Sequence, residues 1–242
     1  MSGPGSAGGD SAADGESFED RAEAGRRLGR RLREEYGGRP DLLVLGLPRG
    51  GVPVAREVAR ALDAPLDVLV VRKLGVPSQP ELAFGAIAGG GERYVDRDMV
   101  RRLGLSEEQI EEVTAREREE LRRREDEYRG GRREVRVEGR TVLVVDDGVA
   151  TGATLQAALR VLREADAGRI VVAVPVAPSD SLEKLAEEAD EVVCLRTPEP
   201  FFAISPHYRS FPQTSDDEVR RLLREAPGAT DPGTESGPPG PM

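Results

Sequence analysis

Two adjacent carboxylates, Asp146 and Asp147, stand between a short apolar run and a turn rich in glycine and threonine. The apolar run, residues 142–145, suits a buried parallel strand, and residues 154–162 carry apolar side chains at helical spacing. The turn therefore lies at the carboxyl end of a strand, where open α/β sheets bind their ligands. Backbone N–H groups at the start of the helix and the threonine hydroxyls of the turn can hold a phosphate.

The two carboxylates need a partner other than the phosphate, because like charges this close together repel. Hydroxyl groups that donate hydrogen bonds, or a divalent cation, would satisfy them. A sugar phosphate meets both demands. The turn lacks the Gly-Lys-Ser/Thr of a P-loop, and no Gly-x-Gly-x-x-Gly of a dinucleotide-binding fold opens it.

A second glycine-rich turn follows the apolar run 42–47 and contains Arg49, Gly50 and Gly51. Residues 52–62 then have helical spacing, so the glycine amides would lie at a helix N-terminus beside a guanidinium, which suits an anion. Such a sequence can also form an ordinary turn. Its position ahead of the carboxylate motif favours the functional interpretation.

The run 142–154 resembles the phosphoribosyl pyrophosphate (PRPP) binding motif of type I phosphoribosyltransferases, in which hydrophobic residues precede two acids and a Thr-Gly-x-Thr turn. The resemblance implies that Asp146 and Asp147 bind the 2′ and 3′ hydroxyls of the ribose. It also implies that the 5′-phosphate is bound by the turn residues Ala150, Thr151, Gly152, Ala153 and Thr154.

The upstream turn resembles the pyrophosphate loop of the same family. This implies that Arg49, Gly50 and Gly51 contact the pyrophosphate, with an unusual backbone geometry at Arg49–Gly50. A hypoxanthine or guanine enzyme carries an aspartate where this chain has Ala150, which argues against those two acceptors.

A further apolar run, residues 66–71, ends in Arg72 and Lys73. In related enzymes a cation at this strand end neutralises the pyrophosphate, and a mobile loop, here 74–85, closes over the reaction. Lys73 is therefore a candidate catalytic residue. Glu81 of the loop is a second candidate, because it could supply the carboxylate that Ala150 does not provide. The alternative is that these side chains are only solvated surface charges.

By resemblance, the chain is expected to transfer a 5-phosphoribosyl group from PRPP to a nitrogen nucleophile, such as a purine or another nucleobase, with release of pyrophosphate. Mg²⁺ is the expected cofactor and would be held mainly through PRPP. The alternative is that Asp146 and Asp147 also bind the ion. One competing class is a regulatory protein that binds PRPP or a nucleotide without catalysis. Another is an interaction protein that uses a charged helix as its surface.

In this family a hood built from segments at the chain ends selects the acceptor. The candidate hood is residues 197–213, which concentrate aromatic side chains in an aromatic-poor chain. Phe202, His207 and Tyr208 are its candidate acceptor-binding residues, because rings can stack on a planar base and a histidine can exchange protons near neutral pH. The alternative is that the aromatic residues pin the C-terminal segment onto the core and that the histidine is structural or exposed.

These motifs require a sheet that brings several strand ends together. Apolar runs alternate with helical patterns, which predicts an α/β fold with a mostly parallel twisted sheet flanked by helices. A β-hairpin over 86–94 would follow the flexible loop. The domain spans 17–226, and the tails 1–16 and 227–242 are too polar to bury a core and are predicted to be disordered. The expected strands lie near 42–47, 66–71, 141–146, 170–175 and 191–195.

A charged helical insertion occupies about 97–130. Within it, residues 106–129 are predicted to form one helix, which a Ser106–Gln109 capping box starts and Gly130 ends. Its few apolar positions predict a solvated helix that packs on the core or on a second subunit, so a homodimer is one predicted arrangement. An RNA-binding arm is disfavoured, since acidic residues outnumber basic ones along the helix.

The formal net charge of −10 and the pI near 4.9 disfavour nucleic acid and anionic membranes as partners, although they allow a local basic pocket for a small phosphorylated substrate. The single cysteine, Cys194, excludes an intrachain disulfide and a cysteine-based metal site. The sequence shows neither a signal-peptide pattern nor an apolar span of about 20 residues, which predicts a cytoplasmic protein.

Overall fold

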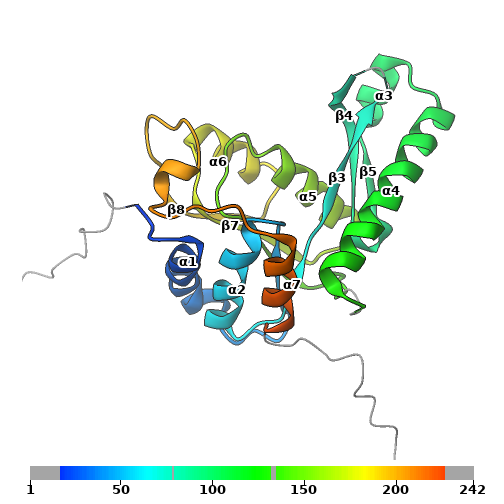
Figure 1. The fold of residues 1–242 in the computed structure, drawn as a ribbon. Coiled ribbons are helices and arrows are strands. Elements are labelled where there is room, and N and C mark those ends of the chain that lie inside the picture. The colour runs from blue at the N-terminus through cyan, green and yellow to red at the C-terminus, as the bar shows by residue number, and fades with distance from the viewer. Residues whose placement is uncertain (1–16, 78, 132–134, 227–242) are drawn as a thin grey trace, which may run out of the picture.

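The computed structural model describes residues 17–77, 79–131 and 135–226, with the backbone but not the side chains of residues 80, 81 and 90. The predicted tails 1–16 and 227–242 lie outside the described residues. Within the described part, a parallel sheet and its helices form a body. An antiparallel sheet and a long helix form an arm that projects from the body (Figure 1).

Five parallel strands form the sheet of the body, in the order β2-β1-β6-β7-β8. Strand β1 pairs with β6 along its whole length, from Leu42 opposite Thr141 to Gly46 opposite Val145. The flanked parallel sheet confirms the predicted α/β class. The strands are β1 (Leu42–Gly46), β2 (Leu66–Val68), β6 (Thr141–Val145), β7 (Arg169–Val176) and β8 (Glu191–Arg196).

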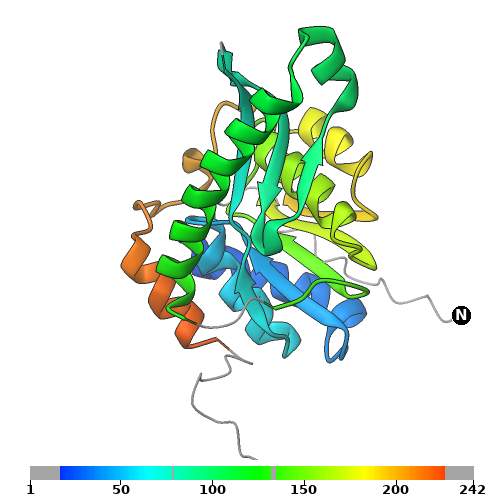
Figure 2. The same cartoon turned by 90° about the vertical axis from the view of Figure 1, so that its right-hand side faces the viewer.

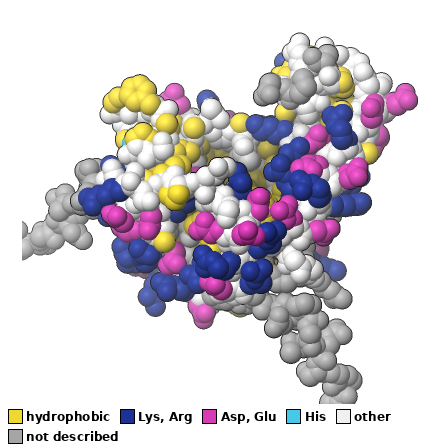
Figure 3. All heavy atoms as spheres, in the orientation of Figure 1, with side chains coloured by type: hydrophobic (Ala, Val, Ile, Leu, Met, Phe, Trp, Pro, Cys, Tyr) yellow, Lys and Arg dark blue, Asp and Glu magenta, His cyan; other side chains and the backbone are white. Residues whose placement is uncertain are grey.

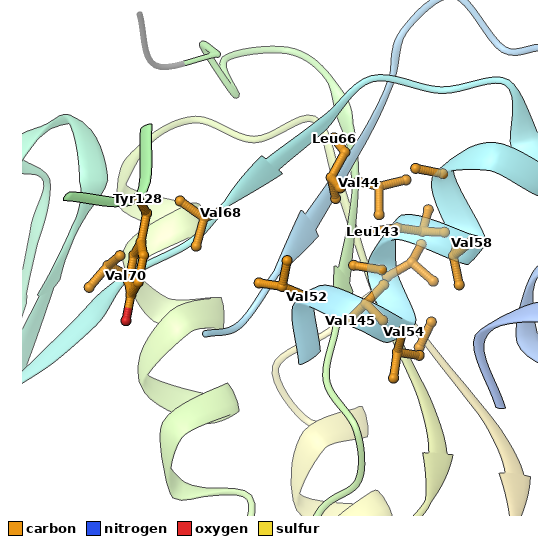
Figure 4. Packing of buried hydrophobic residues seen from close by; sticks show 14 of the residues in the cluster. Val44, Val52, Val54, Val58, Leu66, Val68, Val70, Tyr128, Leu143 and Val145 are labelled. Carbon is orange, nitrogen blue, oxygen red and sulfur yellow. The ribbon is translucent and has the colours of Figure 1, made fainter. Parts of the chain in front are cut away.

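Helices cover both faces of this sheet, because successive residues of a strand point to opposite faces. On one face, Val44 and Val145 pack against Val52 and Val58 (Figure 4). On the other face, the strands pack against the helix that follows β6, through residues such as Leu159. The helices of the body are α1 (Arg21–Tyr36), α2 (Gly51–Leu62), α5 (Ala153–Glu164), α6 (Ser179–Ala186) and α7 (Asp216–Arg224).

Three antiparallel strands, in the order β3-β4-β5, form the sheet of the arm. They are β3 (Val71–Val76), β4 (Gln79–Ala88) and β5 (Arg93–Val95), with a short 3-10 helix, η1 (Gly89–Gly91), between the last two. The predicted hairpin at 86–94 is thereby confirmed, including its turn at the three glycines.

Two predictions in this region are wrong. The apolar run 66–71 is not one strand, because β2 ends at Val68 in the parallel sheet and β3 begins at Val71 in the antiparallel sheet. The segment 74–85 is mostly strand and not a loop, since Leu74 and Phe84 are fully buried in the packing between the arm sheet and its long helix. Burial of these side chains outweighs the turn-forming composition around them.

The charged insertion forms α3 (Arg97–Leu103) and α4 (Glu107–Arg129), and α4 lies along the arm sheet (Figures 1 and 2). The capping box is present: the Ser106 hydroxyl accepts from the Gln109 N–H, and the Gln109 side chain accepts from the Ser106 N–H. Gly130 ends the helix at a φ of +58°. In the described ranges, no helix is long and apolar enough to cross a membrane. The buried stripe of α4 contains Ile110, Val113, Leu121 and Tyr128.

Candidate active site

The strands are parallel, but the order in which the chain adds them to the sheet reverses between β1 and β6. From β1 the chain moves outward to β2, and it later returns to form β6 on the other side of β1. The loops after β1 and β6 therefore leave neighbouring strand ends in opposite directions and open a crevice between them, which is where such sheets bind ligands. Helices α2 and α5 begin at these two loops, so both positive helix ends lie at the crevice.

The loop after β1 packs directly against the two carboxylates. A Cβ atom added at Gly50 would lie 2.0 Å from Oδ2 of Asp147, and one added at Gly51 would lie 2.6 Å from the Val145 carbonyl oxygen and 2.9 Å from Cα of Asp146. Only glycine fits at these two positions without movement of the neighbours. The structure thus brings together the two motifs that the sequence places about 95 residues apart.

The unusual backbone geometry of this loop lies one bond earlier than predicted. The peptide bond between Pro48 and Arg49 is cis, whereas Gly50 has an ordinary φ of −64° and ψ of −31°. The Gly51 N–H donates to the Leu47 carbonyl oxygen at 3.0 Å, and thus holds the turn rather than facing the crevice. Among the described residues, no backbone acceptor is found for the N–H groups of Arg49 and Gly50, so these two remain for an anion.

The Arg49 side chain extends from this loop toward α7. Its guanidinium lies 3.8 Å from a carboxylate oxygen of Asp216, and that residue also accepts a hydrogen bond from the Tyr128 hydroxyl at 2.8 Å. Arg49 is 38% exposed, so a phosphorylated ligand can reach it. Burial of Tyr128 and its bond to Asp216 raise the pKa of that phenol to about 12.

The loop after β6 has the form of a phosphate-binding turn. Gly152 adopts a φ of +75°, where glycine is favoured, and precedes the first residue of α5. The Ser181 hydroxyl of α6 donates to the Ala150 carbonyl oxygen at 2.7 Å and supports the turn. A pocket of about 200 Å³ opens at the turn, with the exposed Thr151 and Thr154 at its wall and Ile204 of the hood also lining it.

The two carboxylates are crowded and largely buried. Oδ1 of Asp146 accepts a hydrogen bond from the Asp147 N–H at 2.8 Å, and Asp147 is only 8% exposed. Burial, followed by the neighbouring charge of Asp147, raises the pKa of Asp146 well above its usual range. Burial also raises the pKa of Asp147, but an arginine partner opposes this shift.

That partner is Arg21, the first residue of α1, which the sequence analysis missed. Its Nε lies 2.8 Å from Oδ2 of Asp147, and both side chains are about nine-tenths buried. The two residues are 126 positions apart, so no local motif joins them. The signal in the sequence is limited to an arginine in the first turn of a helix, where acidic residues are favoured, and that signal does not name a partner.

The N-terminal segment before α1 pairs with the hood. Phe18 makes two backbone hydrogen bonds to it: the Phe18 N–H donates to the His207 oxygen at 2.9 Å, and the Arg209 N–H donates to the Phe18 oxygen at 2.7 Å. The ring of Tyr208 lies 5.4 Å from that of Phe18, and its hydroxyl donates to the backbone oxygen of Asp147 at 2.5 Å. The hood therefore closes on the carboxylate site.

The three predicted acceptor residues differ in their positions. Tyr208 is 5% exposed and pins the hood to the core, so its ring is not available to stack on a base, and burial raises the pKa of its phenol. Phe202 is 87% exposed and stands free of the core. His207 stacks on Phe201 with ring centroids 5.4 Å apart, and partial burial and the charge of Arg196 lower its pKa.

A cleft of about 650 Å³ lies between Thr154, in the first turn of α5, and the arm, and basic side chains line it (Figure 3). Lys73 on β3 is exposed to this cleft. Arg72 lines it too, but Glu117 of α4 pairs with its guanidinium at 2.6 Å. Arg116 of α4 completes the basic wall. The side chain of Glu81 lies outside the described residues, so its predicted role stays a prediction.

Comparison with known proteins agrees with this geometry. Residues 15–210 match the family model described as phosphoribosyl transferase domain. The chain belongs to the phosphoribosyl transferase family. It is 53% identical over 209 residues to a "putative phosphoribosyl transferase" of Mycobacterium tuberculosis strain CDC 1551 and, equally, to one of strain H37Rv; each match covers 86% of this chain and 47% of the relative. The chain thus spans about half the length of the curated relatives it matches.

A solved structure is also similar to this member of the family. The crystal structure of TT1426 from Thermus thermophilus superposes with a TM-score of 0.79 at 43% identity, covering 88% of this chain and all of that one. The predicted family and fold are confirmed. The roles of the individual site residues stay predictions.

The two carboxylates offer limited room for a metal ion. Among the described residues, no three carboxylate, histidine or cysteine side chains converge on one point. Asp146 and Asp147 each commit one oxygen, to a backbone N–H and to Arg21 respectively. Mg²⁺ prefers six oxygen ligands and is commonly bound through one or two carboxylates and substrate phosphates. The donor set therefore fits an ion that arrives with the pyrophosphate of a substrate better than a site built from protein alone.

Proposed function

We propose that this phosphoribosyl transferase transfers the 5-phosphoribosyl group of PRPP to a nitrogen nucleophile and releases pyrophosphate. The observation that carries the proposal is the contact between Gly50 and Asp147, which places the glycine loop, the paired acids and the phosphate turn around one crevice. PRPP carries a matching group for each feature: a pyrophosphate for the glycine loop, two ribose hydroxyls for the paired acids and a 5′-phosphate for the turn.

The paired acids and the phosphate turn would fix the sugar. Asp146 and Asp147 would accept hydrogen bonds from the 2′ and 3′ hydroxyls, while the amides at the start of α5 and the hydroxyls of Thr151 and Thr154 would bind the 5′-phosphate. With both ends of the sugar held, C1 is the atom that moves between leaving group and acceptor.

The glycine loop and the basic cleft would stabilise the departing pyrophosphate. Arg49, Lys73 and the N–H groups of Arg49 and Gly50 are candidates to balance its charge, which grows as the C1–O bond breaks. Mg²⁺ bound to the pyrophosphate would add positive charge to the same oxygens. Because the pyrophosphate of PRPP is anionic before any bond breaks, the exposed Lys73 supports binding of PRPP, and the release of pyrophosphate is the measurement that separates transfer from binding.

Calorimetry with Mg²⁺ and PRPP tests the proposal, followed by measurement of pyrophosphate release with a panel of nucleobases and amines. We expect binding, and release that depends on one class of acceptor. Asp147→Asn keeps the shape of the side chain but loses its charge, so PRPP affinity should fall by about 10- to 100-fold. Unchanged affinity and turnover in that variant would reject the assignment, whereas binding without release from any acceptor would favour a PRPP-binding regulator.

A further inference from the structure

We propose that Arg21 is a positioning residue, which aims the Asp147 carboxylate at the ribose and ties the hood to the same carboxylate. This inference rests on the proposed function, because it concerns how the carboxylate is prepared for PRPP. Arg21 lies outside both motifs that resemble the family, and it belongs to the N-terminal segment that covers the site.

Arg21 makes three contacts at once. Its Nε binds Oδ2 of Asp147 at 2.8 Å, and its Nη1 donates to the backbone oxygen of Pro212 at 2.6 Å. Its guanidinium also lies over the ring of Phe211, 3.7 Å from the ring centroid. One side chain therefore joins α1, the end of β6 and the hood. The planar guanidinium can make these contacts together, whereas an ammonium cannot.

The ion pair leaves the other oxygen of the carboxylate for the substrate. Arg21 occupies Oδ2, so Oδ1 can accept a hydrogen bond from a ribose hydroxyl while the carboxylate plane is held. The Arg21 side chain is 11% exposed, so water competes poorly for this contact. The same side chain fixes the hood at Pro212, which gives the ribose site and the acceptor side a common support.

Arg21 also supplies the positive charge that this buried carboxylate needs. The groups that face Asp147 are Asp146 on its own strand end, Arg21 from α1 and the Tyr208 hydroxyl from the hood. The nearest point of the glycine loop is Gly50, which is uncharged, and Arg49 of that loop is paired with Asp216. Burial raises the pKa of Asp147, and the Arg21 guanidinium opposes this shift.

The test is the dissociation constant of the full chain for Mg²⁺ and PRPP, measured by calorimetry at pH 7 with melting temperatures alongside. The variants are Arg21→Gln, which removes the charge, and Arg21→Lys, which keeps it. Arg27→Gln is the matched control: Arg27 lies on the same helix near the ring of Phe18, but it pairs with Glu23 and not with Asp147.

We expect Arg21→Gln to weaken PRPP binding by about 10- to 100-fold relative to the wild type, because Oδ2 of Asp147 is then no longer held by a charged partner. Arg21→Lys keeps the charge near Asp147 but loses the other contacts, so its affinity should stay within about ten-fold of the wild type. If Arg21→Gln does not fold, the affinity of Arg21→Lys alone tests the inference.

Two results would overturn the inference. The first is wild-type affinity in Arg21→Gln. The second is a loss in Arg21→Lys beyond about ten-fold, which would indicate that Arg21 only supports the shape of the site. Failure of the wild type itself to bind PRPP is a different result, because it overturns the proposed function and this inference with it.

Discussion

Replacing Gly50 by alanine tests the contact on which the crevice depends. The φ of −64° and ψ of −31° at Gly50 are values that alanine adopts freely, so the backbone gives no reason for a loss of stability. The new Cβ would lie 2.0 Å from Oδ2 and 2.7 Å from Cγ of Asp147. Both distances are far below van der Waals contact, so either the carboxylate or the loop has to move.

The size of the effect follows from what that movement disrupts. Overpacking by one methyl group costs about 1–3 kcal/mol. The displaced Oδ2 is also the atom bound by Arg21 at 2.8 Å, and a hydrogen bond to a charged group contributes about 1.5–3 kcal/mol. Since relaxation recovers part of both, we expect the free energy of unfolding to fall by about 2–4 kcal/mol, which lowers the Tm by roughly 4–16 °C. PRPP should bind at least about ten-fold more weakly.

Urea denaturation of a double-mutant cycle with Asp147→Ala separates this contact from other causes. That second substitution removes Cγ and both oxygens, the three atoms nearest the added Cβ. In the Asp147→Ala background, Gly50→Ala should lower the free energy of unfolding by less than about 0.5 kcal/mol. An equal cost in both backgrounds, or no cost in the wild type, would refute the reasoning.

Gly152→Ala places a side chain at a φ of +75° and should cost about 1–2 kcal/mol, seen as a lower Tm together with weaker binding of PRPP; a Tm equal to that of the wild type would argue against this conformation. Tyr208→Phe removes the bond to the Asp147 oxygen and should cost about 1 kcal/mol in urea denaturation, whereas Phe202→Ser at an 87% exposed position should change stability by less than about 0.5 kcal/mol; similar values for both variants would contradict the pinning role of Tyr208. Burial and then the charge of Asp147 raise the pKa of Asp146, so above its usual value the folded state keeps a proton that the unfolded state has lost. The free energy of unfolding should therefore fall as the pH rises toward that raised pKa, and urea titrations at several pH values should show a weaker dependence in Asp146→Asn.

Strands β1, β6 and β7 could be predicted because they are buried on both faces and therefore appear as continuous apolar runs. For the same reason the two glycine-containing loops could be placed at strand ends and at one edge of the sheet. Their contact through Gly50 follows from the strand order, in which β1 and β6 are neighbours, and this order is not visible in either motif alone.

The arm and the hood were harder to predict, because their structure depends on distant partners. Glycine, proline and serine in 74–85 are typical of a loop, yet Leu74 and Phe84 pack between the arm sheet and α4 and hold the segment in strands. Arg21 pairs with a carboxylate 126 residues away, and neither residue carries a local sign of the other. The aromatic cluster of the hood was recognised, but the sequence could not separate the buried Tyr208 from the exposed Phe202.

The closure of the hood has a consequence for the order in which the parts of this protein form during synthesis. The Tyr208 hydroxyl donates to the backbone oxygen of Asp147, which is 61 residues earlier in the chain. Arg21 donates to the backbone oxygen of Pro212, which is 191 residues later. Strands β1 and β6 with their two loops are complete well before those partners leave the ribosome. A nascent chain therefore carries the loop after β6 before the hood covers Asp146 and Asp147. The first residue of α1 finds its hood partner only when nearly the whole domain has been made.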